Sequence, residues 1–196
     1  MIGRNELLKS LNDPDKVWDI IIVGGGATGL GAALDAASRG YQTLLLEQAD
    51  FAKGTSSRST KLVHGGVRYL AQGNIGLVRE ALYERGLLLK NAPHLVKNMS
   101  FIIPNYSWWE RIFYGVGLAI YDLLSRKLSF GKTKHLSKKE TLNCLPGLKP
   151  KGLYGGVVYH DGQFDDARLA VNLAQTCFEQ GATVLNYFRV TGLFKN

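Results

Sequence analysis

The sequence is poor in cysteine and has no long apolar run. Only two of its 196 residues are cysteines, Cys144 and Cys177, and they lie far apart without a C-x-x-C spacing. This argues against a disulfide scaffold or a zinc site and favours a reducing compartment. No run reaches the roughly 18 apolar residues of a membrane-spanning helix, and residues 1–19 lack an apolar core of signal-peptide length. We therefore expect a globular protein located in the cytoplasm.

Positive charge is concentrated in one part of the chain. The formal net charge is +8, and the segment from residue 126 to residue 151 has eight basic residues against one acid, Glu140. Eight minus one leaves +7 in this segment, so the rest of the chain is nearly neutral. The basic residues of the segment are Arg126, Lys127, Lys132, Lys134, Lys138, Lys139, Lys149 and Lys151.

An apolar stretch precedes this basic segment. "RIFYGVGLAIYDLL" (111–124) is predicted to be a helix that is apolar nearly all round, and Ser107 and Glu110 at its start match a capping box. Two interpretations of residues 105–151 remain open. Either the helix is buried and the basic segment is a solvated loop, or both contact an anionic membrane peripherally, where each basic residue contributes about 1 kcal/mol. No motif supports nucleic-acid binding.

Residues 19–47 have the pattern strand, tight turn, helix, strand. Residues 19–23 form a short β-branched run that is typical of a parallel strand buried on both faces. Residues 28–39 follow with apolar positions on one helical face and Gly40 as the stop, and residues 42–47 supply a second strand. This βαβ unit predicts an α/β protein with a Rossmann-like nucleotide-binding core and a right-handed crossover.

The rest of the chain is expected to continue with helices and strands, without an internal repeat or a low-complexity linker. The expected elements are a helix that begins near Ile75 and is ended by Pro93, a strand at 100–106 cut short by Pro104, a strand at 152–162, a helix from Asp165 or Asp166 to Gln180, and strand structure at 182–194.

The turn after the first strand has the glycine spacing of a dinucleotide-binding site. Gly24, Gly26 and Gly29 fit G-x-G-x-x-G between a strand and a helix, and Glu47 ends the next strand. The first glycine permits the turn, the second lets a pyrophosphate approach the backbone, and the third allows close contact between helix and strand. The helix N-terminus offers amides to the phosphates. Glu47 can accept hydrogen bonds from ribose hydroxyls, and an acid there argues against NADP.

The stretch "GTSSRSTKLVHGGVRYL" (54–70) combines short hydroxyl side chains with cations and paired glycines. The hydroxyls suit a second set of contacts to a pyrophosphate, and Lys61 would add charge. On composition alone, a serine-rich surface loop that leads into a helix is an equally good interpretation. The hydroxyl-bearing residues are Thr55, Ser56, Ser57 and Ser59.

The second half of the same stretch suits a flat ring. Gly65 and Gly66 would let the main chain lie against such a ring without a Cβ in the way. His64, Arg68 and Tyr69 would then be carried beside it. A tightly held flavin needs such a segment more than a nicotinamide does.

Four stretches, taken in order, resemble one family. They are "DIIIVGGGATGLGAALDAASRG", "SSRSTKLVHGGVRYL", "EALYERGLLLKNAPHL" and "YHDGQFDDARLAVNLAQTCFEQGATVLNY". From about residue 18 onward the sequence is similar to the FAD-dependent glycerol-3-phosphate dehydrogenases, which belong with D-amino acid oxidase to a larger flavoprotein group. The resemblance implies an N-terminal extension at 1–17 and an FAD-binding domain at 18–196, in which residues 105–151 are an apolar helix plus a basic insertion.

This resemblance implies that FAD accepts a hydride at N5 from C2 of sn-glycerol 3-phosphate, which gives dihydroxyacetone phosphate. The electrons then pass to a membrane quinone, or to oxygen in the oxidases of this group. The enzyme would lie in the cytoplasm or peripherally on the inner face of the cell membrane, and a homo-oligomer remains open. The alternatives are an enzyme of the same group that oxidises an amino or hydroxy acid, and a non-catalytic FAD-binding fragment.

The resemblance also assigns roles to residues. Arg68 and Tyr69 match residues near the substrate end of the flavin and, with His64, are the catalytic candidates. His64 is either a general base or the holder of a structural hydrogen bond. The residues assigned to FAD are Gly24, Gly26, Gly29 and Glu47 for its ADP half, Val190 for the adenine, and Ser56, Ser57, Lys61, His64, Gly65 and Gly66 for the remainder.

The sequence departs from the family in length. Family members continue well past Asn196 into a part that carries most substrate-binding arginines, the base and the last flavin-binding strand. We therefore expect an N-terminal piece whose incomplete sheet leaves an exposed edge. No metal site is expected, because His94 and His135 have no partner at metal-ligand spacing. Turn formation and helix capping are expected to explain the acids Asp161, Asp165 and Asp166.

Overall fold

The computed structural model describes residues 3–125 and 129–195. Two members of the predicted basic segment, Arg126 and Lys127, lie outside the described residues. Among those described, no helix combines the length and the apolar character needed to cross a membrane.

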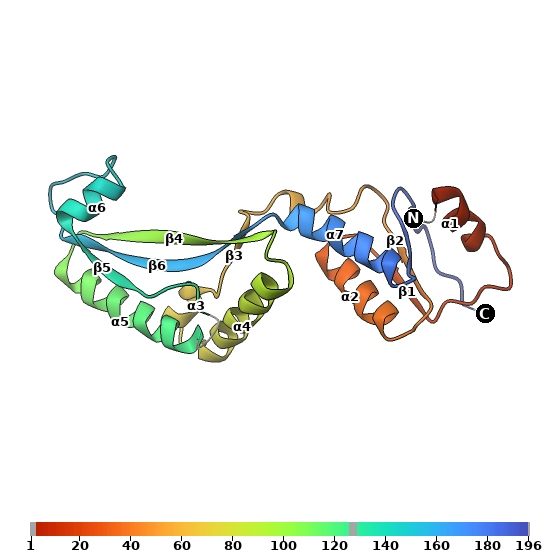
Figure 1. The fold of residues 1–196 in the computed structure, drawn as a ribbon, viewed down its shortest axis with the longest axis horizontal. Coiled ribbons are helices and arrows are strands. Elements are labelled where there is room, and N and C mark those ends of the chain that lie inside the picture. The colour runs from red at the N-terminus through yellow and green to blue at the C-terminus, as the bar shows by residue number, and fades with distance from the viewer. Residues whose placement is uncertain (1–2, 126–128, 196) are drawn as a thin grey trace. The chain divides into compact units, whose positions relative to one another are not determined.

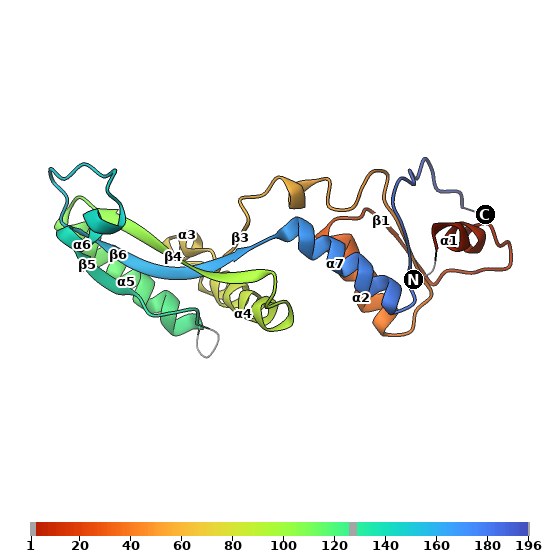
Figure 2. The ribbon, with the colours of Figure 1, turned by 45° about the horizontal axis from the view of Figure 1, so that its top comes forward.

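The chain forms two compact units (Figures 1 and 2). Unit 1 consists of Met1–Thr60 and Asp165–Asn196, and unit 2 consists of Lys61–Phe164. The residues of the predicted domain at 18–196 belong to both units, and the boundaries of that domain remain a prediction.

Unit 1 is built on a parallel three-stranded sheet in the order β1-β2-β7. The strands are β1 (Ile20–Val23), β2 (Thr43–Leu46) and β7 (Thr183–Leu185), and α2 (Ala27–Ser38) connects β1 to β2. The predicted βαβ unit and the α/β fold class are confirmed, and each boundary agrees within one residue. β2 is the central strand, between β1 and β7, and its hydrophobic run is buried.

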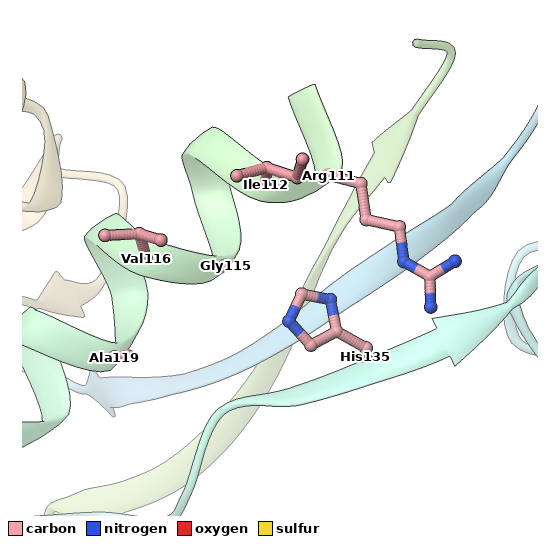
Figure 3. A pocket seen from close by; sticks show the side chains of 6 residues that line it. All are labelled: Arg111, Ile112, Gly115, Val116, Ala119 and His135. Atoms are coloured by element: carbon pink, nitrogen blue, oxygen red, sulfur yellow. The ribbon is translucent and has the colours of Figure 1, made fainter. Parts of the chain in front are cut away.

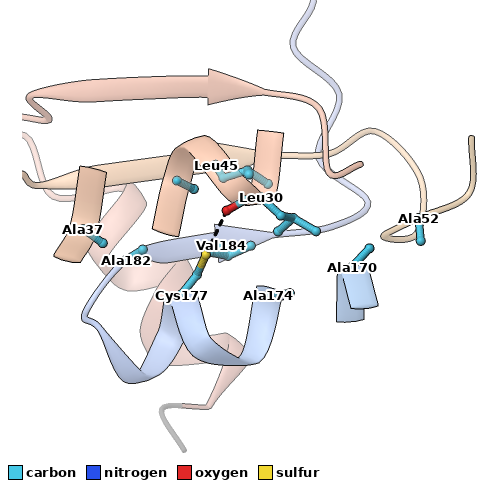
Figure 4. Close-up of a cluster of buried hydrophobic side chains, with 10 residues drawn as sticks. Leu30, Ala37, Leu45, Ala52, Ala170, Ala174, Cys177, Ala182 and Val184 are labelled. Carbon is cyan, nitrogen blue, oxygen red and sulfur yellow. Dashed lines mark hydrogen bonds between the residues drawn. The ribbon is translucent and has the colours of Figure 1, made fainter. Parts of the chain in front are cut away.

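The core of unit 1 lies where α2 and α7 (Asp166–Glu179) pack together with the sheet (Figure 4). Leu30 and Leu45 are fully buried there, and alanines on both helices let the helices approach closely. The Cys177 thiol donates a hydrogen bond to the Leu30 carbonyl, 3.5 Å away. Asp165 is the N-cap of α7 and accepts the N–H of Arg168 at 3.1 Å, which confirms the predicted helix start.

Two strand predictions in unit 1 are wrong in part. The first strand is covered on one face only: Ile22 packs against the core, whereas Ile21 is 55% and Val23 62% exposed. The strand predicted at 182–194 ends at Leu185. The backbone turns there, with a φ of +56° at Tyr187, and the amides that follow bond to a neighbouring loop instead of to a strand.

The predicted N-terminal extension contains a helix, α1 (Arg4–Leu11), that the sequence reasoning did not assign. The Arg4 guanidinium donates to the side-chain oxygen of Asn186 at 2.8 Å and to its carbonyl at 2.7 Å. The Asn186 amide donates in turn to Asp50 at 3.0 Å. These bonds attach α1 to the segment that follows β7.

Unit 2 contains an antiparallel sheet with β6 (Gly155–Phe164) at its centre. One edge of β6 pairs along its whole length with β4 (Val96–Asn105). Its other edge pairs with β5 (Lys134–Ser137) and with the short β3 (Leu62–Val63). The strands predicted near 100–106 and 152–162 therefore exist. The first is longer than expected, and the second begins three residues later and ends two residues later than expected.

Pro104 does not cut its strand short, contrary to the prediction. It lies inside β4 opposite Gly156. Among the described strands β4 pairs only with β6 and is therefore an edge. Proline is tolerated on an edge strand, because its missing N–H can face away from the partner.

Helices α3 (Val67–Ala71), α4 (Ile75–Asn91) and α5 (Trp108–Ser125) lie along one face of this sheet (Figure 1). The predicted capping box is confirmed at the start of α5. Glu110 accepts the N–H of Ser107 at 3.1 Å, and the Ser107 hydroxyl accepts the N–H of Glu110 at 3.4 Å.

The basic segment is not a loop throughout, because it supplies β5 and α6 (Lys138–Cys144). A second capping box starts α6: Glu140 accepts the Ser137 N–H at 2.7 Å, and the Ser137 hydroxyl accepts the Glu140 N–H at 3.3 Å. The letters "SKKE" carried this signal in the sequence. The side chains of Lys134, Lys138 and Lys139 remain exposed.

We expect the two thiols to react at very different rates. Cys144 is exposed, whereas Cys177 is fully buried, and burial raises the pKa of its thiol to about 11. Because the thiolate is the reactive form, a thiol reagent at pH 8 should modify one cysteine quickly and the other only after unfolding. The control is Cys144→Ser, which should remove the fast phase. Rapid modification of both thiols in the native protein would contradict this packing.

Candidate functional site

The turn between β1 and α2 and the start of α2 contain the three predicted glycines. The N-terminus of α2 is left open there. Gly24 has a φ of +118°, which favours glycine. Gly26 is the N-cap of α2 and supplies no side-chain acceptor, so the space beside the first amides of the helix is open. A Cβ at Gly29 would collide with the Gly24 carbonyl oxygen, so α2 rests directly on the turn. Such a helix end binds phosphate well.

Glu47 lies one residue beyond β2, and its carboxylate binds the same turn. One oxygen accepts the Gly25 N–H at 2.6 Å and the other accepts the Ala49 N–H at 2.8 Å. Each oxygen keeps a lone pair that can accept from a sugar hydroxyl. A Cβ at Gly25 would overlap with Glu47 and Phe51, so this position also needs glycine. The G-x-G-x-x-G pattern leaves this residue open, and sequence reasoning did not include it.

The predicted adenine contact, Val190, is half-buried in the irregular chain after β7. Backbone hydrogen bonds bring the preceding residues to the Glu47 loop. Phe188 donates its N–H to the carbonyl of Glu47 at 2.8 Å, and Tyr187 donates to Ala49 at 2.9 Å. The chain leading to Val190 therefore runs beside the residues that hold the glycine turn.

The serine hydroxyls predicted to contact the pyrophosphate belong to a short 3₁₀ helix, Thr55–Ser57. Ser56 is half-buried. The Ser57 hydroxyl already donates to the Ala52 carbonyl at 2.6 Å. Ser57 can accept a further hydrogen bond, but it must release Ala52 before its hydroxyl can donate to a phosphate.

In unit 2, the predicted flavin-facing residues lie on both sides of β3, with Lys61 before it and the others after it. Lys61 has a φ of +59°, and its carbonyl accepts the Phe164 N–H at 3.0 Å. His64 is exposed, and its Nδ1 accepts the Gly66 N–H at 3.1 Å. A neutral His64 in this geometry carries its proton on Nε2. It has no free lone pair for a substrate proton unless the Gly66 bond opens.

Both paired glycines are explained by contacts inside unit 2. A Cβ at Gly65 would collide with Leu82 and with the Tyr121 hydroxyl. Gly66 has a φ of +70° and faces the Tyr69 ring, which is 44% exposed. The predicted contact with a flat ring is therefore not needed to explain either glycine. Arg68 belongs to α3, and its side chain lies outside the described residues.

Sequence reasoning missed a buried polar cluster beside Gly65. Arg85 and Asp161 form an ion pair at 2.8 Å, with 1% and 4% of their side chains exposed. The Tyr121 hydroxyl donates to Asp161 at 2.8 Å and accepts the Gly65 N–H at 2.8 Å. Burial, followed by the charge of Asp161 and the bond to it, raises the pKa of Tyr121. The proposal that Asp161 forms a turn is wrong, because it lies inside β6.

One sequence signal could have revealed this cluster. Arg85 lies between Val78, Leu82 and Leu89 on the helical face that the spacing predicted to be buried. An arginine there needs a buried acid as partner, because an unpaired charge in a core is costly.

A shallow hollow of about 500 Å³ lies between α5 and β5 (Figure 3). Gly115 lets the His135 ring approach the helix, because a Cβ at this glycine would contact that ring. Arg111 extends from α5 over the strand that carries His135 (Figure 3). The other lining residues, Ile112, Val116 and Ala119, make the hollow mainly apolar. The hollow belongs to unit 2, as do the flavin-facing candidates.

The structure thus gathers the predicted residues into two groups. Unit 1 brings Gly24, Gly26, Gly29 and Glu47 together at one turn. Unit 2 holds the segment from Lys61 to Tyr69. Within residues 3–125 and 129–195, no group of three or more His, Cys, Asp or Glu side chains is arranged to hold a metal ion.

The family model described as "FAD dependent oxidoreductase" matches residues 19–196. The chain therefore belongs to the FAD dependent oxidoreductase family, in agreement with its parallel βαβ core and glycine turn. Within this family it resembles the FAD-dependent glycerol-3-phosphate dehydrogenases. The mitochondrial glycerol-3-phosphate dehydrogenases of Mus musculus and Saccharomyces cerevisiae are 44% and 45% identical over 97% and 100% of this chain. The chain spans only 27% and 31% of their respective lengths.

Solved structures agree with this assignment. The glycerol-3-phosphate dehydrogenase from Bacillus halodurans complexed with FAD has a TM-score of 0.70 and 33% identity, over 98% of this chain and 30% of that one. L-proline dehydrogenase from P. horikoshii has a TM-score of 0.68 and 20% identity, over 91% of this chain and 46% of that one. At that identity, the second likeness concerns the fold alone.

We expect Gly29→Ala to destabilise unit 1. The new methyl group collides with the Gly24 carbonyl, so α2 must move away from β1, at a cost of about 1–3 kcal/mol. Chemical denaturation followed by circular dichroism measures this loss. Gly31→Ala on the same helix is the matched control, because a Cβ there meets open space. It should stabilise by about 0.5–1 kcal/mol. Equal effects of the two variants would contradict the close contact at Gly29.

Proposed function

We propose that this chain is the FAD-binding part of an enzyme that oxidises sn-glycerol 3-phosphate to dihydroxyacetone phosphate and passes electrons to a quinone. Family membership and the resemblance to glycerol-3-phosphate dehydrogenases support this assignment. An enzyme acting on an amino or hydroxy acid is the alternative within the family.

The observation that carries the proposal is the open N-terminus of α2 beside Glu47. The first amides of α2 have no side-chain cap at Gly26, and the adjacent space is open. A diphosphate fits there, because the helix end offers N–H groups and a partial positive charge. The Glu47 carboxylate is held by Gly25 and Ala49 and keeps acceptor capacity for ribose hydroxyls. The donor set therefore fits the ADP half of FAD, with Val190 expected at the adenine.

The remaining contacts are proposed from the segment that begins at the 3₁₀ helix. Ser56 and Ser57 would contact the pyrophosphate, and Lys61, Gly65 and Gly66 would line the flavin. Bound FAD supplies the two-electron acceptor for a hydride from C2 of the substrate. His64 would fix the backbone through its bond to Gly66 rather than act as general base. Arg68 and Tyr69 would bind the substrate phosphate and hydroxyl oxygens.

Purified protein tests the proposal directly. Protein titrated with FAD should turn yellow and quench the flavin fluorescence, and glycerol 3-phosphate should bleach the colour under anaerobic conditions. A yellow protein that is bleached by amino or hydroxy acids instead would support the alternative enzyme. Yellow protein that no substrate bleaches would indicate a cofactor module without catalysis. Folded protein that binds no FAD would overturn the proposal.

Glu47→Gln should weaken FAD binding about ten- to a hundredfold. The change removes a charged acceptor for the ribose hydroxyls, and hydrogen bonds to charged groups contribute about 1.5–3 kcal/mol. Titration of flavin fluorescence measures the dissociation constant. The matched control is Glu80→Gln on the exposed surface of α4, which should leave the constant unchanged.

A second proposal concerns the partner of α5: we infer that this helix docks on an anionic membrane. Seven large apolar side chains on α5 are between 42% and 76% exposed. At 3.6 residues per turn they fall within roughly 140° of the helix circumference, so they form one face. They are Trp108, Trp109, Ile112, Phe113, Val116, Ile120 and Leu123.

The charges around this apolar face suit acidic lipids. Arg111 on α5 and Lys132, Lys134 and Lys138 beyond it are all exposed. Glu110 is used in the capping box, and Asp122 accepts the N–H of Thr133. An exposed apolar stripe with tryptophans and flanking cations is typical of a helix that lies in the membrane interface. Such docking would keep a flavin enzyme close to a membrane quinone.

Val116→Glu should reduce binding to vesicles of acidic phospholipid about tenfold. The variant replaces an apolar contact by a like charge. Sedimentation with acidic and neutral vesicles measures this effect, and added salt should weaken binding of the wild-type protein. Val171→Glu on α7 is the matched control, because Val171 is 53% and Val116 57% exposed. If the wild-type protein does not sediment with acidic vesicles, the docking proposal fails. Another part of a longer protein would then be the candidate to cover the apolar face of α5.

A further inference from the structure

The Tyr121 hydroxyl connects the Gly65 backbone to a buried carboxylate. It accepts the Gly65 N–H at 2.8 Å and donates to Asp161 at 2.8 Å. Tyr121 is 1% exposed, so water does not compete for these bonds. Gly65 lies between β3 and α3, Tyr121 on α5 and Asp161 on β6, and these hydrogen bonds join the three parts of unit 2.

Asp161 is itself held in one orientation. One carboxylate oxygen accepts from Arg85 at 2.8 Å and from the Gly162 N–H at 3.1 Å, which leaves the other oxygen for Tyr121. The Arg85 guanidinium also stacks over the Phe130 ring at 4.2 Å and contacts the His160 carbonyl at 3.4 Å. Because burial and the neighbouring carboxylate raise the pKa of Tyr121, it keeps its proton and remains the donor.

The direction of these hydrogen bonds restricts the backbone of the loop between β3 and α3. A phenol that donates to a carboxylate can only accept from Gly65, so the Gly65 N–H must point at Tyr121. Leu82 and the Tyr121 hydroxyl occupy the space where a Cβ at Gly65 would lie, which restricts the loop further. The next residue, Gly66, bonds back to His64. The buried phenol therefore fixes Gly65 directly, and a local bond ties its two neighbours together.

We propose that Tyr121, oriented by Asp161 and Arg85, is a positioning residue that fixes the backbone at Gly65, between His64 and Gly66, before FAD binds. The inference rests on the proposed function, in which this segment lines the flavin. A preformed loop binds its ligand more tightly, because the cost of ordering it has been met during folding.

Amide hydrogen exchange of the full chain, resolved by NMR, tests the first half of the proposal. In wild-type protein without FAD, the Gly65 amide should already be protected. In Tyr121→Phe, which loses both hydrogen bonds but keeps the ring, exchange at Gly65 should be about tenfold faster. Tyr114→Phe, two turns earlier on the same helix, is the matched control and should leave Gly65 unchanged. A Gly65 amide that becomes protected only when FAD is added would overturn the idea of a preformed loop, even if the variant does not fold.

FAD titration tests the second half. Tyr121→Phe should bind FAD roughly three- to tenfold more weakly than wild-type protein, with a shifted visible flavin spectrum, whereas Tyr114→Phe should match wild type. If wild-type protein binds FAD and Tyr121→Phe binds it equally well despite faster Gly65 exchange, the proposed function stands and the positioning role is wrong. If wild-type protein binds no FAD, the proposed function itself fails.

Discussion

The contact between the first turn of α2 and the glycine turn before it is the constraint on which unit 1 depends. Because Gly29 has no side chain, the helix rests on the Gly24 carbonyl, and its first amides open into free space at Gly26. The same turn is bound by the Glu47 carboxylate at the end of the neighbouring parallel strand. The close contact between α2 and this turn therefore brings two features together on one short stretch of backbone. They are the helix N-terminus, which attracts anions, and the Glu47 carboxylate, which accepts hydrogen bonds from hydroxyls.

Unit 2 uses a different device, since its fixed loop is held by buried polar groups instead of by glycine packing alone. Arg85, Asp161 and Tyr121 come from two helices and the central strand. Both oxygens of Asp161 and the Tyr121 hydroxyl are hydrogen-bonded, whereas the buried Nε of Arg85 has no partner among the described residues. The cost of burying an ion pair is substantial. The position of the Arg85–Asp161 ion pair beside a segment with proposed cofactor contacts supports a role in orientation rather than in stability.

Local patterns predicted much of the fold. The βαβ unit, the capping box at Ser107 and the N-cap at Asp165 were correct, because each depends on neighbours a few residues apart. The errors have a common cause. Pro104 was tolerated because its strand is an edge, and Ile21 and Val23 are exposed on β1, which is an edge among the described strands. Edges and covered faces are set by partners that lie far away in the sequence.

By itself, the sequence determined the glycine turn, the acid that follows the second strand and the family to which the chain belongs. These features depend on residues that are close together in the sequence, and their chemistry does not depend on the rest of the fold. Only the tertiary structure decided that position 65 must be glycine, because Leu82 and the Tyr121 hydroxyl fill the space that a side chain would need. It also decided that Asp161 is the buried partner of Arg85 rather than a turn residue. The physical reason is that burial and hydrogen-bond direction arise from side chains 40 to 76 residues apart, which only packing brings together.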